Sequence, residues 1–297
     1  MMKRYPYLPE ILYTKYKMIW HNQENSLDTL YPYLQPYNVE VDNNGCIYIT
    51  KGECPEGQNY PCFAAHLDTV HRGDPKPVLL QDTYLISTNG NGIGGDDKCG
   101  LVACLELLKA LPYCKAVFFV EEESGAKGSR ECDMNFFDDC RYVIEIDRRG
   151  SEDLIQQSGS TKLCDDEFAD TLEKYGFKRD RGTFTDVNNL TNRGVSINTA
   201  NVSSGYYNAH TGDEYVNLKE LRRNIHKVLK FAQQEYLGDR VLFKTTKKYS
   251  IPKGFPSFLS KSSNEESDFG LCACCGKYSE NLSYSSEKNS WVCEKCK

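Results

Sequence analysis

Short apolar runs in residues 62–147 each lead into a cluster of acidic or histidine side chains, and this pattern constrains the fold more than any other feature of the chain. The runs have the length and composition of buried strands, and LVACLELLKAL has the apolar spacing of a helix packed on a sheet. This alternation predicts a three-layer α/β/α fold with a mixed, mainly parallel central sheet. The clusters lie in CFAAHLDTV, GIGGDDKCG, VFFVEEESG and YVIEIDRRG, beyond the carboxyl ends of strands, where such folds bind ligands.

Weaker patterns predict the other elements of this domain. They are one or two helices in residues 9–35, hairpins at 38–52 and 78–87, a helix over 166–177, a strand over 193–202 and an amphipathic helix over 217–237. Between 148 and 165 the patterns are too weak to predict an element.

The length of 297 residues accommodates one large domain and a small appendage. We place the first at 1–239, a linker or surface arm at 240–270 and the appendage at 271–297. A net charge of −6 does not favour nucleic acid as a partner. No apolar run approaches the ~20 residues of a membrane helix, and MMKRYPYLPE lacks the apolar core of a signal peptide. We therefore expect a cytoplasmic protein without a membrane partner.

Five of the fourteen cysteines fall in the last 26 residues. Cys272 and Cys275 form one C-x-x-C pair, and Cys293 and Cys296 form a second. Four thiolates at this spacing predict a zinc ribbon around one structural zinc ion, with Cys274 left over. Disulfides are the alternative, which a reducing compartment disfavours. Such a ribbon could serve a protein partner or simply cap the structure.

The acidic clusters predict a metal centre. Residues two apart in a strand point to the same side, so His66 and Asp68 face one site. Carboxylates that converge on one edge repel one another, and divalent cations remove that repulsion. Two histidines and three or four carboxylates suit two zinc ions that share a carboxylate, while manganese or cobalt could replace zinc. The alternative is that the acids are solvated and the histidines merely packed.

The motifs AAHLDTV, GGDDKCG, EEESG, EIDRRG and NAHTGDEYV, in this order, resemble the dinuclear-zinc peptidases that include peptidase T, glutamate carboxypeptidase, aminoacylase and the leucyl aminopeptidases. The likeness spans residues 10–237. It implies that His66 and Asp147 bind one zinc ion, that Glu123 and His210 bind the other, and that Asp96 bridges both.

The resemblance also implies how such a site would work. Glu122 would be the general base for a zinc-activated hydroxide, Asp68 would orient His66, and the peptide between Asp96 and Asp97 would be cis. Because adjacent residues of an extended chain point oppositely, the backbone must bend for Glu122 and the next residue to reach one centre, and Gly125 suits this turn.

Only residues 148–209 separate the fourth expected ligand from the last, so the inserted lid of peptidase T is absent here. Substrate contacts would then come from loops. Asp186 could contact substrate or support the site, although a helix N-cap is an equal alternative. Arg148 and Arg149 could clamp a substrate carboxylate, although such arginines more often pair with surface acids.

Together these features predict hydrolysis of peptide or related amide bonds by an aminopeptidase or small-peptide peptidase. One alternative is an amidohydrolase or deacylase of N-acyl amino acids. The other is a metal-bound scaffold without catalysis that acts through its ribbon.

Overall fold

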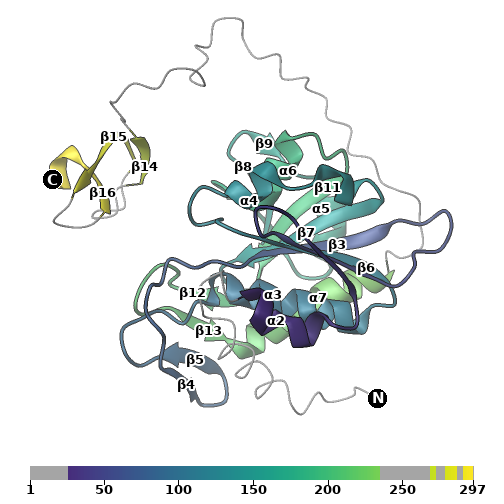
Figure 1. The fold of residues 1–297 in the computed structure, drawn as a ribbon, viewed down its shortest axis with the longest axis horizontal. Coiled ribbons are helices and arrows are strands. Elements are labelled where there is room, and N and C mark those ends of the chain that lie inside the picture. The colour runs from purple at the N-terminus through teal and green to yellow at the C-terminus, as the bar shows by residue number, and fades with distance from the viewer. Residues whose placement is uncertain (1–25, 235–267, 272–277, 286–289, 297) are drawn as a thin grey trace, which may run out of the picture. The chain divides into compact units, whose positions relative to one another are not determined.

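The computed structural model describes residues 26–234, 268–271, 278–285 and 290–296 (Figure 1). The chain divides into two compact units, Met1–Thr246 and Lys247–Lys297. Among the helices of the described residues, none combines the length and the apolar content needed to cross a bilayer. The part of the predicted N-terminal helices before residue 26 lies outside the described residues.

The first unit is built on a nine-stranded mixed sheet. The central strands β6, β3, β7 and β11 run parallel to one another, and among the other pairs only β8 with β10 is parallel. The predicted α/β fold with a mixed sheet is therefore confirmed. In spatial order the strands are β1 (Asn38–Val41), β2 (Ile47–Lys51), β6 (Cys114–Phe119), β3 (Tyr60–His66), β7 (Cys140–Arg148), β11 (Asn198–Ser203), β8 (Asp153–Ser158) and β10 (Lys178–Gly182), with β9 (Thr161–Lys162) paired to β8.

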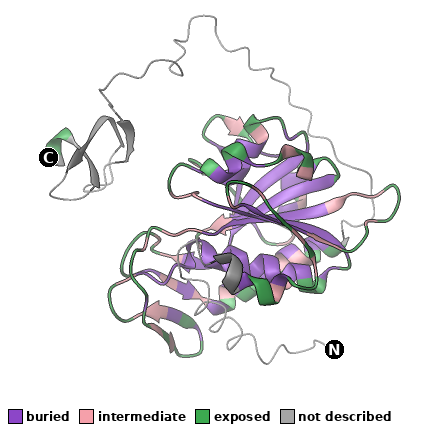
Figure 2. Cartoon of the chain, viewed as in Figure 1, coloured by how far each residue is buried: buried purple, intermediate pink, exposed green. Residues whose placement is uncertain are grey.

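Helices cover both faces of this sheet (Figure 1). On one face α3 (Gly95–Ala110) packs against α7 (Leu218–Gln234), and on the other α4 (Lys127–Glu131) packs against α6 (Asp186–Asn192). The central strands between them are almost entirely buried, which is why they appear in the sequence as continuous apolar runs (Figure 2). Among the described residues of this unit, the other helices are α2 (Ser26–Leu34), η2 (Met134–Phe137) and α5 (Asp166–Lys174).

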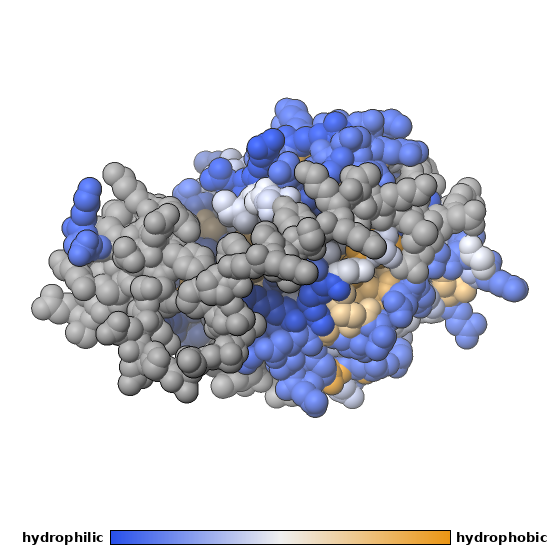
Figure 3. All heavy atoms as spheres, turned by 90° about the horizontal axis from the view of Figure 1, so that it is seen from above, coloured by the Kyte–Doolittle hydropathy of each residue, from blue (hydrophilic) through white to orange (hydrophobic). Residues whose placement is uncertain are grey.

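A smaller antiparallel sheet lies beside α3. Its order is β12 (Tyr206–Tyr207), β13 (Tyr215–Asn217), β5 (Tyr84–Ser87) and β4 (Pro77–Leu80). Leu85 and Val216 on its inner face are completely buried, whereas Val78, Leu80 and Tyr84 on its outer face are exposed. Much of the described surface is hydrophilic, with apolar areas confined to small regions of the face seen in Figure 3.

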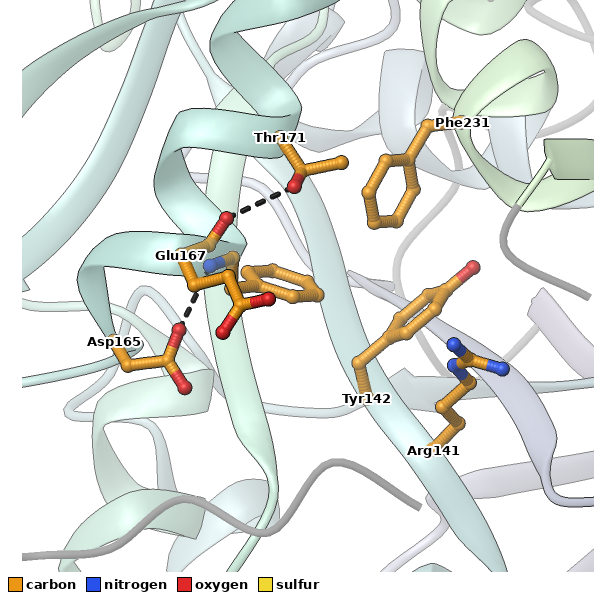
Figure 4. Close-up of a pocket in the computed structure, with 7 residues that line it drawn as sticks. Arg141, Tyr142, Asp165, Glu167, Thr171 and Phe231 are labelled. Atoms are coloured by element: carbon orange, nitrogen blue, oxygen red, sulfur yellow. Dashed lines mark hydrogen bonds between the residues drawn. The ribbon is translucent and has the colours of Figure 1, made fainter. Parts of the chain in front are cut away.

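A small pocket opens at the amino end of β7 (Figure 4). Its floor is aromatic, because the ring of Tyr142 lies 5.2 Å from that of Phe231 and 5.5 Å from that of Phe168. The remaining lining residues are Arg141, Asp165, Glu167 and Thr171. Tyr142 lies five residues before Asp147 on the same strand, so the pocket is about 17 Å from the predicted metal site. It is therefore separate from that site.

The second unit contains a three-stranded antiparallel sheet of β14 (Asp268–Leu271), β15 (Tyr278–Ser285) and β16 (Ser290–Cys293), followed by η3 (Glu294–Cys296). β14 includes the last residues of the predicted linker. Cys272, Cys274 and Cys275 lie outside the described residues, so the structural zinc site remains a prediction.

Candidate metal centre

The five side chains predicted to bind metal meet at the carboxyl edge of the main sheet. Because β6, β3 and β7 are parallel neighbours, the residues at their carboxyl ends lie side by side. His66 ends β3, Asp147 lies near the end of β7, and Glu123 follows β6. Asp96 comes from the distorted first turn of α3, and His210 from the turn between β12 and β13.

The carboxylate of Asp96 lies between the two histidines. Its Oδ1 is 3.1 Å from Nε2 of His66, and its Oδ2 is 3.2 Å from Nε2 of His210. A second carboxylate accompanies each histidine: Oδ1 of Asp147 lies 3.7 Å from Nε2 of His66, and Oε2 of Glu123 lies 3.0 Å from Nε2 of His210. Two three-residue groups therefore share Asp96, which is the arrangement that a bridging ligand would need.

This donor set fits divalent cations. In each group the candidate ligand atoms lie within 4.8 Å of one another. Oε1 of Glu123 is buried and has no hydrogen-bond partner, as expected of an oxygen that would bind a cation. Burial lowers the pKa of His66, but Asp147, Asp68 and Asp96 raise it well above its usual value. Asp96 and Glu123 raise the pKa of His210 to about 10. The carboxylates thus favour positive charge at both histidines, which is the charge that divalent cations would supply.

Asp68 holds the loop that carries the proposed base. Its Oδ1 accepts the backbone N–H of Glu122 at 3.0 Å, and its Oδ2 accepts that of Glu123 at 3.1 Å. Oδ1 also lies 3.4 Å from Nδ1 of His66, as predicted. The backbone bends at Glu121, whose φ is 53°, and Gly125 follows with a φ of 96°. The bend therefore begins before the predicted glycine.

Glu122 is placed to accept a proton. It forms a third candidate metal-binding group with His66 and Glu123. Burial is the main reason that its pKa rises to about 7, with a further contribution from neighbouring carboxylates. A bound cation would lower this pKa, because positive charge favours the carboxylate. A general base works best with a pKa near the working pH.

Asp97 and Lys98 support the site from inside. The Asp96–Asp97 peptide is cis, as predicted. Oδ1 of Asp97 accepts Gly100 N–H at 2.9 Å, and Oδ2 accepts His66 N–H at 3.4 Å. Lys98 was not predicted, although it directly follows two acids in GGDDKCG. It is completely buried, and its Nζ donates to the carbonyl of Leu67; burial lowers its pKa to about 8.

The three predicted substrate contacts differ in their positions. Arg148 donates to Asp153 at 3.1 Å and to Asp180 at 3.4 Å, which favours the surface-pair alternative. Arg149 is exposed. Asp186 is completely buried at the first residue of α6, so it is not accessible to a substrate.

The N-terminus of α6 is capped by a glutamate from the sheet instead of by Asp186. Oε1 of Glu145 accepts Asp186 N–H at 3.2 Å, Oε2 accepts Val187 N–H at 3.4 Å, and the hydroxyl of Thr185 also donates to Oε2. Burial raises the pKa of Glu145 to about 7, although these hydrogen bonds oppose the rise. The N-cap alternative for Asp186 is therefore wrong, because Thr185 occupies that position.

The fold is that of a class of solved peptidases. The aminopeptidase PepT from Bacillus cereus superposes with a TM-score of 0.66 and 16% identity, over 77% of this chain and 98% of that chain. A tripeptidase from Staphylococcus aureus gives a TM-score of 0.61 and 16% identity, over 76% and 98%. The TET1 peptidase of Pyrococcus horikoshii gives 0.59 and 16%, over 75% and 99%.

No protein-family model matches the sequence, and no curated protein matches it either. At such low identities the structural similarity establishes the fold, and any conclusion about the reaction depends on the side chains of the site.

Proposed function

We propose that this chain is a divalent-metal-dependent hydrolase that cleaves peptide bonds in short peptides, as an aminopeptidase or small-peptide peptidase. The observation that carries the proposal is the position of Asp96, whose two carboxylate oxygens face His66 and His210. The similarity in fold to an aminopeptidase and a tripeptidase supports it.

In this proposal His66 and Asp147 would hold one cation, Glu123 and His210 would hold the other, and Asp96 would be shared by both. Zinc is the expected metal, and manganese or cobalt suits the same nitrogen and oxygen ligands. Such cations lower the pKa of a water molecule toward neutrality and polarise a carbonyl group.

The chain's own residues then move the proton. The carboxylate of Glu122 accepts a proton from the attacking water as the C–O bond forms. It donates that proton to the amide nitrogen as the C–N bond breaks, so that a neutral amine can leave. Asp68 holds the backbone of Glu122 and thereby limits the positions that this carboxylate can take.

The expected substrate is a peptide or small amide, which loops around the site would contact. Arg149, which is exposed and lies two residues after Asp147 in the sequence, is the remaining candidate to bind a substrate carboxylate. We also infer that the ribbon holds a structural zinc ion through Cys272, Cys275, Cys293 and Cys296 and contacts a protein partner.

The direct test combines metal analysis with a substrate panel. The purified full-length protein would be assayed with di- and tripeptides, aminoacyl-p-nitroanilides and N-acetyl amino acids, after reconstitution with zinc, manganese or cobalt. We expect three equivalents of metal, two at the centre around Asp96 and one in the ribbon, together with release of N-terminal residues and loss of activity with a chelator. Cleavage of N-acetyl amino acids alone would instead indicate a deacylase.

The matched variants are Glu122→Gln and Glu121→Gln. Both remove one carboxylate from neighbouring positions, but Glu121 lies at the surface, where Lys127 pairs with it at 3.5 Å. Glu122→Gln should lower kcat by at least about 100-fold with the metal content unchanged, since general-base catalysis contributes about that much. Glu121→Gln should match the wild type. Equal rates for all three proteins would overturn the catalytic role of Glu122. Rates no higher than the uncatalysed background in all three would favour the scaffold alternative.

A further inference from the structure

Glu214 is a buried carboxylate for which the sequence suggested no role. Its side chain is completely inaccessible, and three N–H groups donate to it. Oε1 accepts the backbone N–H of Asp96 at 3.0 Å, and Oε2 accepts the backbone N–H of Gly94 at 2.7 Å. Nε2 of His71 lies 2.9 Å from Oε2, and because a carboxylate only accepts, this nitrogen carries the hydrogen.

The donors connect Glu214 directly to the shared ligand. Gly94 and Asp96 belong to the segment that brings the Asp96 carboxylate between the two histidines. Glu214 therefore fixes the backbone from which that carboxylate projects. The hydrogen bonds to Gly94 and Asp96 together restrain both the position and the rotation of this segment, whereas one bond would leave it free to rotate.

Glu214 also belongs to the same turn as His210. Its N–H approaches the carbonyl of Thr211 at 3.3 Å, and the hydroxyl of Thr211 donates to the carbonyl of Asn208 at 2.7 Å. The turn is compact, and both Asn208 and His210 have positive φ angles, 54° and 64°. One short segment thus carries a predicted ligand, His210, and the anchor for another, Asp96.

Glycines allow the two segments to touch. A Cβ atom on Gly95 would lie 2.8 Å from both Tyr206 and Val216, and one on Gly212 would collide with the carbonyl of Gly90. The ring of His71 similarly occupies the space that a side chain on Gly92 would need. The glycine-rich stretch NGNGIGG therefore fits tightly under the turn that bears Glu214.

We propose that Glu214 is a positioning residue for the metal centre. It sets the distance between Asp96 and His210, and His71 ties the loop at 69–74 to the same anchor. This inference rests on the proposed function, because it concerns the cation that Asp96 and His210 would share. A purely structural carboxylate would stabilise the fold without changing metal affinity.

The test compares Glu214→Gln with Asp213→Asn. Both substitutions remove one negative charge at adjacent positions, but the side chain of residue 213 is exposed. The Gln side chain has almost the same shape, yet its NH2 group cannot accept a hydrogen bond. Zinc affinity of the metal-free protein would be measured by competition calorimetry, with circular dichroism to confirm the fold. We expect one of the two zinc equivalents at the Asp96 centre to bind about 10- to 100-fold more weakly in Glu214→Gln, while the ribbon equivalent stays unchanged.

Activity provides a second reading of the same variant. At low free zinc, Glu214→Gln should lose activity that added zinc restores, with KM for the peptide unchanged. Asp213→Asn should behave as the wild type in both assays. Circular dichroism at low free zinc separates positioning of the metal from a general loss of stability, since added zinc would also stabilise a partly unfolded variant. A folded variant that regains activity with zinc supports positioning.

If Glu214→Gln does not fold, His71→Phe provides the test. Phenylalanine keeps a ring over Gly92 but removes one of the three donors, so a smaller weakening of the same zinc equivalent is expected. The inference would be overturned if a folded Glu214→Gln bound zinc as tightly as the wild type. Where His71→Phe replaces that variant, unchanged zinc affinity would have the same meaning. Zinc binding by the wild type without peptide hydrolysis would instead overturn the proposed reaction and leave the affinity comparison valid.

Discussion

The side chain of Asn201 holds both backbone polar groups of Asp147. Its Oδ1 accepts the N–H of Asp147 at 3.0 Å, and its Nδ2 lies 3.2 Å from the carbonyl oxygen. Nδ2 also donates to the hydroxyl of Thr185 at 2.9 Å, and Thr185 donates to Glu145. A chain of hydrogen bonds thus runs from β11 through α6 to β7, and it fixes the strand end that presents a predicted ligand.

Replacing Asn201 with Leu should destabilise the protein and weaken metal binding together. Leucine has a similar volume but leaves the N–H and carbonyl of Asp147 without this partner in a buried environment. An unsatisfied buried group costs about 1–3 kcal/mol, so we expect a loss of roughly 2–4 kcal/mol of unfolding free energy in urea titrations.

The control for this variant is Asn192→Leu at the end of α6. Asn192 is exposed and accepts a single hydrogen bond, from Thr161 at 3.0 Å. Its replacement should cost less than about 0.5 kcal/mol, the usual range for surface positions. Equal losses of unfolding free energy for the two variants would show that the hydrogen bonds from Asn201 to Asp147 contribute no more to stability than a surface hydrogen bond.

Replacing Gly100 with Ala should destabilise the protein, although alanine is the better helix former. In a helix interior alanine gains about 0.5–1 kcal/mol over glycine. At Gly100, however, a Cβ atom would lie 2.5 Å from the carbonyl oxygen of Ile146 and would collide with the carboxylate of Asp97. Overpacking typically costs about 1–3 kcal/mol, so packing should outweigh helix propensity. A higher urea midpoint for the variant would contradict this account.

The sequence predicts the central strands of this structure because the burial of each strand leaves a pattern of apolar residues within the strand itself. Strands such as β3 and β7 are buried on both faces, so they must be continuously apolar. By contrast, β10 reads Lys-Arg-Asp-Arg-Gly, is largely exposed and lies at the edge of the sheet. It is a strand because it pairs with β8, and its own residues show no pattern from which that pairing could be predicted.

The metal centre was predictable to the extent that strand ends reveal it. His66 and Asp147 lie where parallel strands end, and the resemblance to dinuclear-zinc peptidases implied their roles and that of Asp96, which lies in the first turn of α3. Asn201 and Glu214 could not be predicted, since their roles depend on hydrogen bonds to residues 54 and 118 to 120 positions away. The acid in HTGDEYV was visible, but nothing in the sequence indicated which backbone it would hold.

Replacing Lys115 with Met should lower stability in a way that depends on pH. Nζ of Lys115 donates to the carbonyl of Phe136 at 2.8 Å and to Oδ1 of Asp139 at 2.5 Å. Burial lowers the pKa of Lys115, but nearby groups, Asp139 among them, raise it above its usual value overall. A lysine with a raised pKa contributes stability fully below its unfolded value of about 10.4 and loses it as the pH rises further.

The free energy of unfolding of the wild type should therefore exceed that of Lys115→Met by about 1–2 kcal/mol at neutral pH. The two values should converge above about pH 10.4. Urea titrations of both proteins at pH 7, 9 and 11 would measure this difference. A gap that stays constant over that range would mean that packing of the lysine stem, not its charge, sets the stability.

Removing divalent metal should lower the stability of the first unit by more than an ordinary single substitution does. Without cations Asp96, Glu123 and Asp147 lie together around the two histidines, and no divalent charge offsets the repulsion between the carboxylates. A ligand present at 100 times its Kd stabilises the folded state by about 2.7 kcal/mol, and two such cations would contribute about twice that. Calorimetric scans with zinc and with a chelator should therefore differ by several degrees in Tm.

The same comparison on Asp96→Asn should show a much smaller difference, because the shared carboxylate is then missing. An equal shift in this variant would place the bound metal elsewhere in the chain.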